Sequence, residues 1–87
     1  MNQKHYQILI TRQAEKDIRK LSPKLKDKLY DILTEVISVD PFQGKKLIGD
    51  LEGRCSYHLN YQERIIYSVD AAKKIVYLER ARSHYED

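Results

Sequence analysis

Hydrophobic and polar positions first alternate along the chain and then recur at helical spacing. Residues 5–11, "HYQILIT", are rich in β-branched and aromatic side chains, which is typical of a β-strand. Apolar residues occur on both faces of this stretch, so we expect the strand inside a sheet or covered. Thr11 then offers its side-chain oxygen as an N-cap, and Ala14, Ile18 and Leu21 follow at the spacing of a short amphipathic helix.

A second helical pattern starts almost at once. Ser22 can cap this helix, Pro23 sits where a missing N–H costs nothing, and the pattern predicts an end near Ser38. Two helices joined by almost no loop form a hairpin with a joint apolar face, which needs a sheet to cover it. The apolar stripe of the second helix consists of Leu25, Leu29, Ile32, Leu33 and Val36.

The second half of the chain predicts that sheet. Residues 40–53 carry all three glycines and one of the two prolines, which indicates an irregular loop. Three strands joined by hairpin-sized links follow, at residues 54–60, 64–70 and 73–83. The order β-α-α-β-β-β predicts a single α+β domain over residues 1–87, with a helical hairpin packed on a small, mostly antiparallel sheet.

Length and composition narrow the classes of function. A chain of 87 residues builds one modest core, so any active site lies on its surface. The formal net charge of +3, with Lys and Arg spread along the chain, fits an anionic partner. Cys55 is the only cysteine, which excludes an intramolecular disulfide and a thiol-rich zinc site. No apolar run is long enough to span a membrane, so we expect a cytoplasmic protein without membrane contact, metal ion or cofactor.

Candidate chemistry gathers at the C-terminal end, "RARSHYED". Arg80, Arg82, His84 and Tyr85 end the last strand, and antiparallel pairing brings this end beside Arg64, which opens the strand before it. Whether these residues share one face stays open, because a bulge would change the alternation. Arginine binds phosphate in a bidentate manner, histidine exchanges protons near neutral pH, and a tyrosine ring can stack on a base. The cluster therefore favours RNA chemistry that needs no metal.

Arg64, Lys45 and Lys46 can also have purely structural roles. Arg64 can pair with Glu63 or Glu79 at a sheet edge, and such exposed pairs contribute about 0–1 kcal/mol. Lys45 and Lys46 can be a solvated charge pair, and they gain importance only if their loop folds over the tail cluster.

Longer motifs in the second half resemble a known family. The stretch "DPFQGKKLIGDLEGRCSYHLNYQERIIYSV", followed by a terminal "RSHY", resembles the RelE/ParE superfamily of toxins from type II toxin–antitoxin modules, most closely its Txe/YoeB branch. The similarity covers nearly the whole chain and implies a RelE-like microbial RNase fold. It also implies a ribosome-dependent mRNA endoribonuclease, an mRNA interferase that inhibits translation and growth. Such toxins cleave A-site codons by attack of a ribose 2′-hydroxyl on the adjacent phosphate.

The resemblance implies roles for individual residues. Arg64 matches the arginine that contacts the scissile phosphate, His84 the proton-donating histidine, and Tyr85 the tyrosine that stacks on or orients the nucleotide. The other residues expected to bind RNA are Lys45, Arg54, His58, Arg80 and Arg82.

The general base is where the chain departs from the family. The Txe/YoeB branch carries a glutamate before its L-x-x-x-L-x-G motif, and this chain has Gly44-Lys45-Lys46 in a shorter stretch there. RelE toxins lack that glutamate and use lysines from this region. Lys46, with Lys45, is therefore the expected substitute, and His58 is an alternative base.

The resemblance also implies partners and leaves two other functions open. The implied partners are a cognate antitoxin whose acidic or amphipathic segment wraps the helices and sheet, the ribosome with its mRNA, and operator DNA reached only through the antitoxin. ParE-type toxins of the same superfamily poison DNA gyrase, although Arg64 with a His-Tyr end argues against that function. The missing glutamate keeps open a catalytically degenerate toxin that only binds its antitoxin and DNA.

Overall fold

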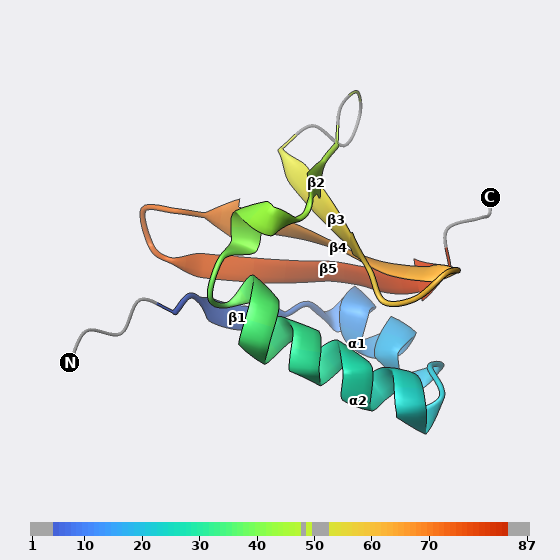
Figure 1. The fold of residues 1–87 in the computed structure, drawn as a ribbon. Coiled ribbons are helices and arrows are strands. Elements are labelled where there is room, and N and C mark those ends of the chain that lie inside the picture. The colour runs from blue at the N-terminus through green and yellow to red at the C-terminus, as the bar shows by residue number, and fades with distance from the viewer. Residues whose placement is uncertain (1–4, 48, 50–52, 84–87) are drawn as a thin grey trace.

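The computed structural model describes residues 5–47, 49 and 53–83. Its helical elements are α1 (Arg12–Arg19), α2 (Pro23–Ile32), a π-helical turn (Leu33–Ile37) and a 3-10 turn (Pro41–Gln43). Its strands are β1 (Gln7–Ile10), β2 (Lys45–Lys46), β3 (Arg54–His58), β4 (Glu63–Asp70) and β5 (Ile75–Ser83). The predicted α+β order is confirmed, with β2 as an additional short strand (Figure 1).

The strands form one sheet in the order β1-β5-β4-β3-β2. β1 runs parallel to β5, and the other pairs are antiparallel. Tight turns join β3 to β4 and β4 to β5, which is why these strands follow one another as a meander. The expected mostly antiparallel sheet is therefore confirmed.

Both helices begin where the sequence predicts. The Thr11 hydroxyl accepts a hydrogen bond from the backbone N–H of Ala14 at 3.2 Å, and the Ser22 hydroxyl accepts one from Leu25 at 3.3 Å. Each bond satisfies one of the free N–H groups at a helix start. α2 then continues through the π-helical turn to Ile37, so its predicted end near Ser38 is also confirmed.

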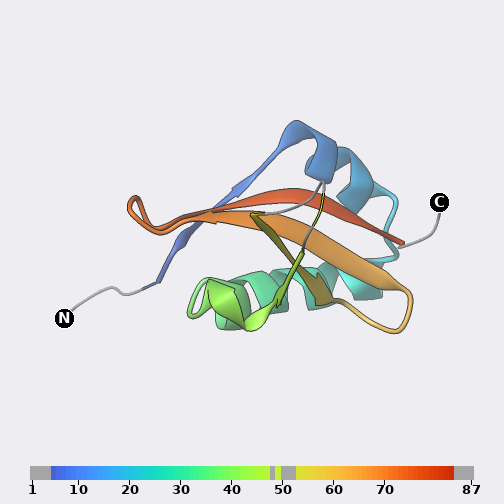
Figure 2. The same cartoon turned by 90° about the horizontal axis from the view of Figure 1, so that it is seen from above.

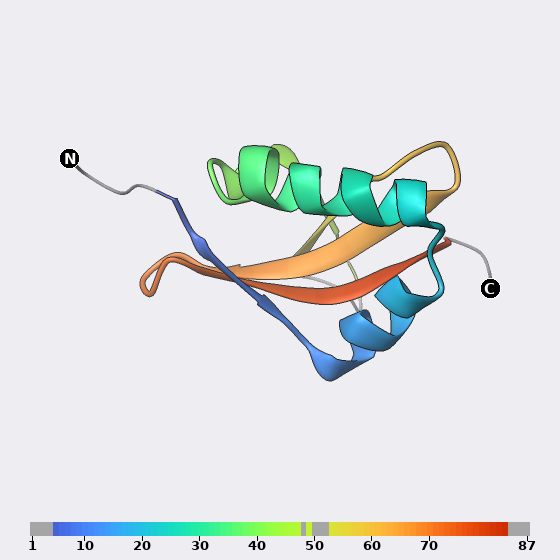
Figure 3. The same cartoon turned by 90° about the horizontal axis from the view of Figure 1, so that it is seen from below.

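Apolar side chains of the helices and the sheet form one core. α2 covers one face of the sheet, and α1 packs against β5 on the other side of the strands (Figures 2 and 3). None of the described helices is long and apolar enough to cross a membrane. The buried core residues are Ala14, Ile18, Leu29, Ile32, Leu33, Ile37, Cys55, Leu59, Ile65, Tyr67, Val76, Leu78 and Ala81.

The face of β3 and β4 turned away from α2 carries polar and basic residues. Cys55, Ile65 and Tyr67 are buried toward α2, and side chains alternate along each strand, so their neighbours lie on the opposite face. We call this side the open face, defined by Arg54, Ser56, His58, Arg64, Ile66 and Ser68.

The expectation that the first strand lies inside the sheet or under a cover is wrong. Among the described strands, β1 lies at the edge of the sheet and pairs with β5 alone. Leu9 and Ile10 are 38% and 41% exposed. The apolar residues on both faces of β1 thus reflect partial burial at the rim of the sheet, which alternation alone does not distinguish from a central strand.

Candidate functional site

The last residues of β5 pair with the start of β4, where Arg64 lies, as predicted. Arg82 is the register partner of Arg64 on one side, and His58 of β3 is its partner on the other. Residues directly opposite in an antiparallel pair have Cβ atoms about 4.5–5.5 Å apart. We call these three positions the basic row. The predicted His84 and Tyr85 lie outside the described residues.

A β-bulge in β5 determines which of its residues accompany Arg64. Ile66 pairs with Arg80, whereas the next residue of β4, Tyr67, pairs with Leu78, so Glu79 is an extra residue. Leu78 is buried in the core under α2, and beyond the bulge the alternation is shifted by one residue. Arg80 and Arg82 therefore occupy register positions opposite residues of the open face, which resolves the question that the sequence left open.

The two lysines predicted for the site, Lys45 and Lys46, line different hollows. Lys45 pairs with Ser56 and lines an open hollow of about 400 Å³ together with His58 and Arg64. Lys46 pairs with Cys55 and lines a different hollow, which includes Phe42 and Arg54. Only Lys45 thus lines the same hollow as two members of the basic row.

A buried hydrogen bond fixes the backbone just before Lys45. The Tyr67 hydroxyl donates to the carbonyl oxygen of Pro41 at 2.6 Å, and burial raises the pKa of this hydroxyl above its ordinary value of 10.0. A Cβ atom at Gly44 would overlap the Tyr67 hydroxyl and the Ser56 carbonyl oxygen, so only glycine fits there. The sequence offered no signal for this bond beyond the glycine before the two lysines.

Arg54 is held by a carboxylate on the open face. Its Nε donates to one oxygen of Glu79, and the Ser68 hydroxyl donates to the other oxygen at 2.9 Å. Glu79 is the bulged residue of β5, so the bulge itself supplies this anchor. Glu79 thus pairs with Arg54 and not with Arg64, which was one of the ordinary roles considered for Arg64.

Arg80 is also paired. Its Nε donates to Asp17 of α1 at 2.8 Å, and the backbone N–H of Ala81 donates to the same carboxylate oxygen at 3.1 Å. Burial alone would raise the pKa of Asp17, but the hydrogen bonds and the charge of Arg80 outweigh it and lower the pKa below the ordinary 3.8. Asp17 thereby ties α1 to β5 where β1 no longer flanks that strand, a role that the sequence analysis missed.

The hollow lined by Lys45, His58 and Arg64 contains basic side chains that, unlike Arg54 and Arg80, can bind a ligand without breaking an ion pair within the described residues. Within the described part of the chain, Lys45, His58 and Arg64 make no side-chain hydrogen bond or ion pair. Two cations can hold an anion such as a phosphate, and an imidazole in the same hollow can accept or donate a proton. Among the described residues, no three His, Cys, Asp or Glu side chains lie close enough together to hold a metal ion.

Comparisons with known proteins agree on a family. The model of a family described as the ParE-like toxin of type II bacterial toxin–antitoxin systems matches residues 8–86. The structure is similar to the RelBE2 toxin–antitoxin complex from Mycobacterium tuberculosis, with a TM-score of 0.84 and 25% identity over 92% of this chain and 99% of that chain.

Two further solved structures share the fold. The YoeB/ParE toxin from Agrobacterium tumefaciens has a TM-score of 0.79 and 20% identity, over 91% of this chain and 99% of that chain. The YoeB–YefM complex from Staphylococcus aureus has a TM-score of 0.74 and 23% identity, over 92% of this chain and 98% of that chain. No curated protein matches the chain.

Proposed function

Because the chain belongs to the ParE-like toxins of type II bacterial toxin–antitoxin systems, we propose that it is a ribosome-dependent mRNA endoribonuclease. The observation that carries this proposal is the hollow that Lys45, His58 and Arg64 line together. Arg82 is the register partner of Arg64, and His84 and Tyr85 follow it in the sequence. Lys45 and Arg64 supply phosphate-binding charge to this hollow, and His58 supplies a group that can transfer a proton.

The proposed reaction is an internal transfer at one phosphodiester. The ribose 2′-oxygen attacks the adjacent phosphorus, the bond from phosphorus to the 5′-oxygen breaks, and the products are a cyclic phosphate and a free 5′-hydroxyl. Arg64 binds the phosphate oxygens and stabilises the extra negative charge that they carry in the pentavalent transition state. His84 gives a proton to the leaving 5′-oxygen, and Tyr85 stacks on a neighbouring base.

For the general base we propose His58 in place of the absent glutamate. His58 lies directly opposite Arg64, the proposed phosphate ligand, and its neutral imidazole can accept the 2′-hydroxyl proton. Lys45 contributes positive charge from the same hollow. Lys46, which the sequence favoured, lines a hollow that contains neither His58 nor Arg64.

The proposed partners follow from the same family. The similar structures from M. tuberculosis and S. aureus are toxin–antitoxin complexes, which supports a cognate antitoxin for this chain. The net charge of +3 suits both an acidic antitoxin segment and ribosomal RNA. The proposed reaction occurs in the cytoplasm, because the substrate is mRNA on a ribosome, and the toxin reaches operator DNA only through its antitoxin.

The test is induction of the toxin in cells without antitoxin, with mRNA ends mapped by primer extension and growth scored alongside. The wild type should cut within translated codons, and Arg64→Ala and His84→Ala should lose both the cuts and the growth arrest. Cuts that persist at wild-type frequency in both variants would refute the assigned roles.

A second function is favoured by the matched family model itself, which is described as ParE-like. Growth arrest without mRNA cuts would support a toxin that poisons DNA gyrase. Absence of both arrest and cuts would support a degenerate toxin whose remaining role is to bind its antitoxin.

A further inference from the structure

The strand β2 is too short to fix its own register. It contains two residues, Lys45 and Lys46, which pair with Ser56 and Cys55 of β3. Side chains alternate along a strand, so a slip by one residue would exchange the faces of the two lysines. Lys45 would then leave the hollow that Arg64 lines, and Lys46 would take its place. The register of β2 therefore decides which lysine belongs to the proposed catalytic site.

The residue just before the two lysines is packed against a buried hydroxyl. Gly44 has an extended backbone, with φ −71° and ψ 169°, which any residue can adopt. A Cβ atom there would overlap the Tyr67 hydroxyl oxygen and would lie 2.7 Å from the Ser56 carbonyl oxygen, whereas real Cβ atoms essentially never come within 3.0 Å of such atoms. Packing, and not backbone conformation, therefore requires glycine at this position.

The Tyr67 hydroxyl is held in place from two directions. The Tyr67 ring is fully buried in the core, on a strand paired with Cys55 of β3. Its hydroxyl donates to the Pro41 carbonyl oxygen at 2.6 Å, so a movement of the oxygen would break a buried hydrogen bond. The hydroxyl is thus a fixed obstacle beneath the segment 41–44.

This obstacle excludes a slip of β2 in either direction. A slip by one residue places Gln43 or Lys45 where Gly44 lies, and both residues carry a Cβ atom. Either Cβ atom would overlap the Tyr67 hydroxyl. The observed register avoids the overlap by placing glycine there, and it is also the register in which Lys45 lines the hollow.

We propose that Tyr67 and Gly44 are positioning residues that hold β2 in the register in which Lys45, and not Lys46, lines the catalytic hollow; this inference rests on the proposed function. The Tyr67 side chain is buried and does not line the hollow, so it acts on the reaction through Lys45. A displacement of about 1 Å in a catalytic group can cost about 100-fold in rate, and a slip of register moves the lysine to the other face.

The first test measures mRNA cleavage on translating ribosomes. Gly44→Ala should reduce the rate about as much as Lys45→Ala does, by about 10- to 100-fold, because the added Cβ atom displaces β2 from its register. Lys45→Ala added to Gly44→Ala should lower the rate further by less than about threefold, since the lysine is already displaced. Independent effects would multiply instead.

Tyr67→Phe removes the obstacle without adding an atom. The difference in cleavage between Lys45→Ala and Lys46→Ala should shrink by at least about threefold in this background, because β2 then populates both registers.

Ile18→Val is the matched control for a general loss of stability. Ile18 is buried in α1, which packs on β5, and it lines neither of the two hollows that contain the lysines. In this background, Lys45→Ala and Lys46→Ala should differ as they do in the wild type. Thermal unfolding verifies that each variant is folded at the assay temperature.

A second measurement needs no RNA. Nuclear Overhauser effects in the isotope-labelled full chain should pair Lys45 with Ser56 and Lys46 with Cys55 in the wild type and in Ile18→Val. These cross-strand signals should weaken or shift by one residue in Gly44→Ala and in Tyr67→Phe.

Unchanged pairings in both Gly44→Ala and Tyr67→Phe would overturn the inference, as would losses of cleavage that multiply when Gly44→Ala and Lys45→Ala are combined. A toxin that cleaves no RNA but loses the pairings in both variants refutes only the nuclease. A toxin that cleaves RNA and keeps the pairings in both variants refutes only the positioning role.

Discussion

At the scale of single residues, the basic side chains divide into those held by carboxylates and those left available. Arg54 and Arg80 are committed to Glu79 and Asp17, whereas Lys45 and Arg64 have no ion pair within the described residues. Arg80 stabilises the fold, because leaving its buried partner Asp17 unpaired costs more than an exposed pair contributes. Arg54 and Glu79 are only partly buried, so their pair contributes less. The available side chains are the ones that a phosphate can recruit.

This division predicts different effects for adjacent lysines. Lys45→Ala should reduce mRNA cleavage by about 10- to 100-fold, because it removes a charge from the hollow that contains Arg64. Lys46→Ala is the matched control and should stay within about twofold of wild type, since Lys46 lines another hollow. Cleavage rates measured on translating ribosomes decide between them. The reverse ranking would restore Lys46 as the catalytic lysine.

The buried hydrogen bond from the Tyr67 hydroxyl leads to a prediction about stability. Tyr67→Phe should lower the free energy of unfolding by about 1–3 kcal/mol, because the buried Pro41 carbonyl loses its partner while the ring still fills the core. Urea unfolding measures the change. Tyr57→Phe, a half-buried position with no side-chain hydrogen bond to the described residues, is the control and should change stability by less than about 0.5 kcal/mol. Equal stability of wild type and Tyr67→Phe would show that the bond contributes nothing net.

The residue scale also shows what the sequence was able to predict of the site. The proximity of Arg82 to Arg64 follows from two adjacent antiparallel strands, and the structure confirms it. The separation of Lys45 from Lys46 depends on a strand of two residues and on the distant Tyr67 hydroxyl. A pattern that short has no period to detect, and a bond between residues far apart in sequence leaves no local signal.

At the scale of elements, the helices were more predictable than the strands. Thr11 and Ser22 act locally as caps, so the starts of α1 and α2 could be predicted from a few adjacent letters. The edge position of β1 and the bulge at Glu79 depend on partners elsewhere in the chain. The bulge has the larger effect on the site. Without it, Arg80 and Arg82 would occupy positions on the same face as Leu78, toward the core.

The contact between α1 and β5 predicts an acid-sensitive element. The pKa of Asp17 is lower in the folded chain than the ordinary 3.8, so its ionised form stabilises the fold above about pH 4 and this contribution is lost as the pH falls through the folded pKa. Asp17→Asn should lower the free energy of unfolding by about 1–3 kcal/mol at pH 7 and should flatten its decline below about pH 4.

Urea unfolding from pH 7 to pH 2 measures both effects of Asp17→Asn. Asp27→Asn is the control, because Asp27 is exposed on α2 and has no side-chain hydrogen bond or ion pair with the described residues. Parallel pH profiles for wild type and Asp17→Asn would show that the Arg80 pair does not respond to acid.

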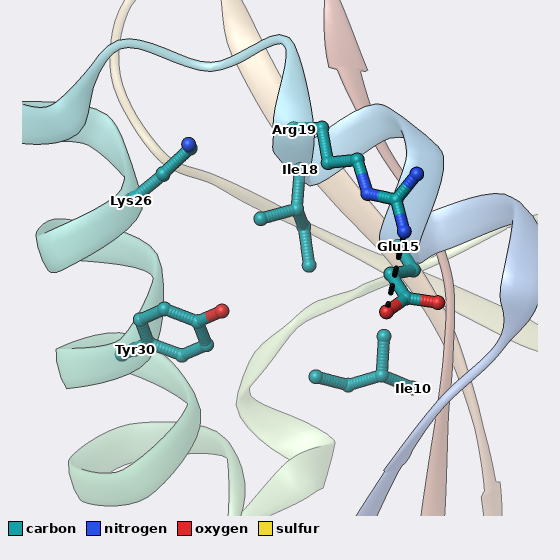
Figure 4. Close-up of a pocket in the computed structure, with 6 residues that line it drawn as sticks. All are labelled: Ile10, Glu15, Ile18, Arg19, Lys26 and Tyr30. Carbon is teal, nitrogen blue, oxygen red and sulfur yellow. Dashed lines mark ion pairs between the residues drawn. The ribbon is translucent and has the colours of Figure 1, made fainter.

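At the scale of the whole molecule, the two sides of the domain present different surfaces. The basic row and its hollow belong to β2, β3, β4 and β5. A groove of about 350 Å³ belongs to α1, α2 and β1, where Ile10, Ile18 and Tyr30 line it (Figure 4). These two surfaces share no lining residue, so a substitution in one should leave the other unchanged.

From the shape of the hollow we predict that cleavage requires the ribosome. The hollow is open, so by itself it would not hold an RNA strand in the bent geometry that in-line attack needs. Purified toxin should therefore cut an mRNA on translating ribosomes at least about 100-fold faster than the same mRNA alone. Arg64→Ala is the control for contaminating nuclease in both reactions. Equal rates on free and ribosome-bound mRNA would mean that the toxin positions its substrate unaided, and DNA breaks trapped with gyrase in a parallel reaction would transfer the target from RNA to the topoisomerase.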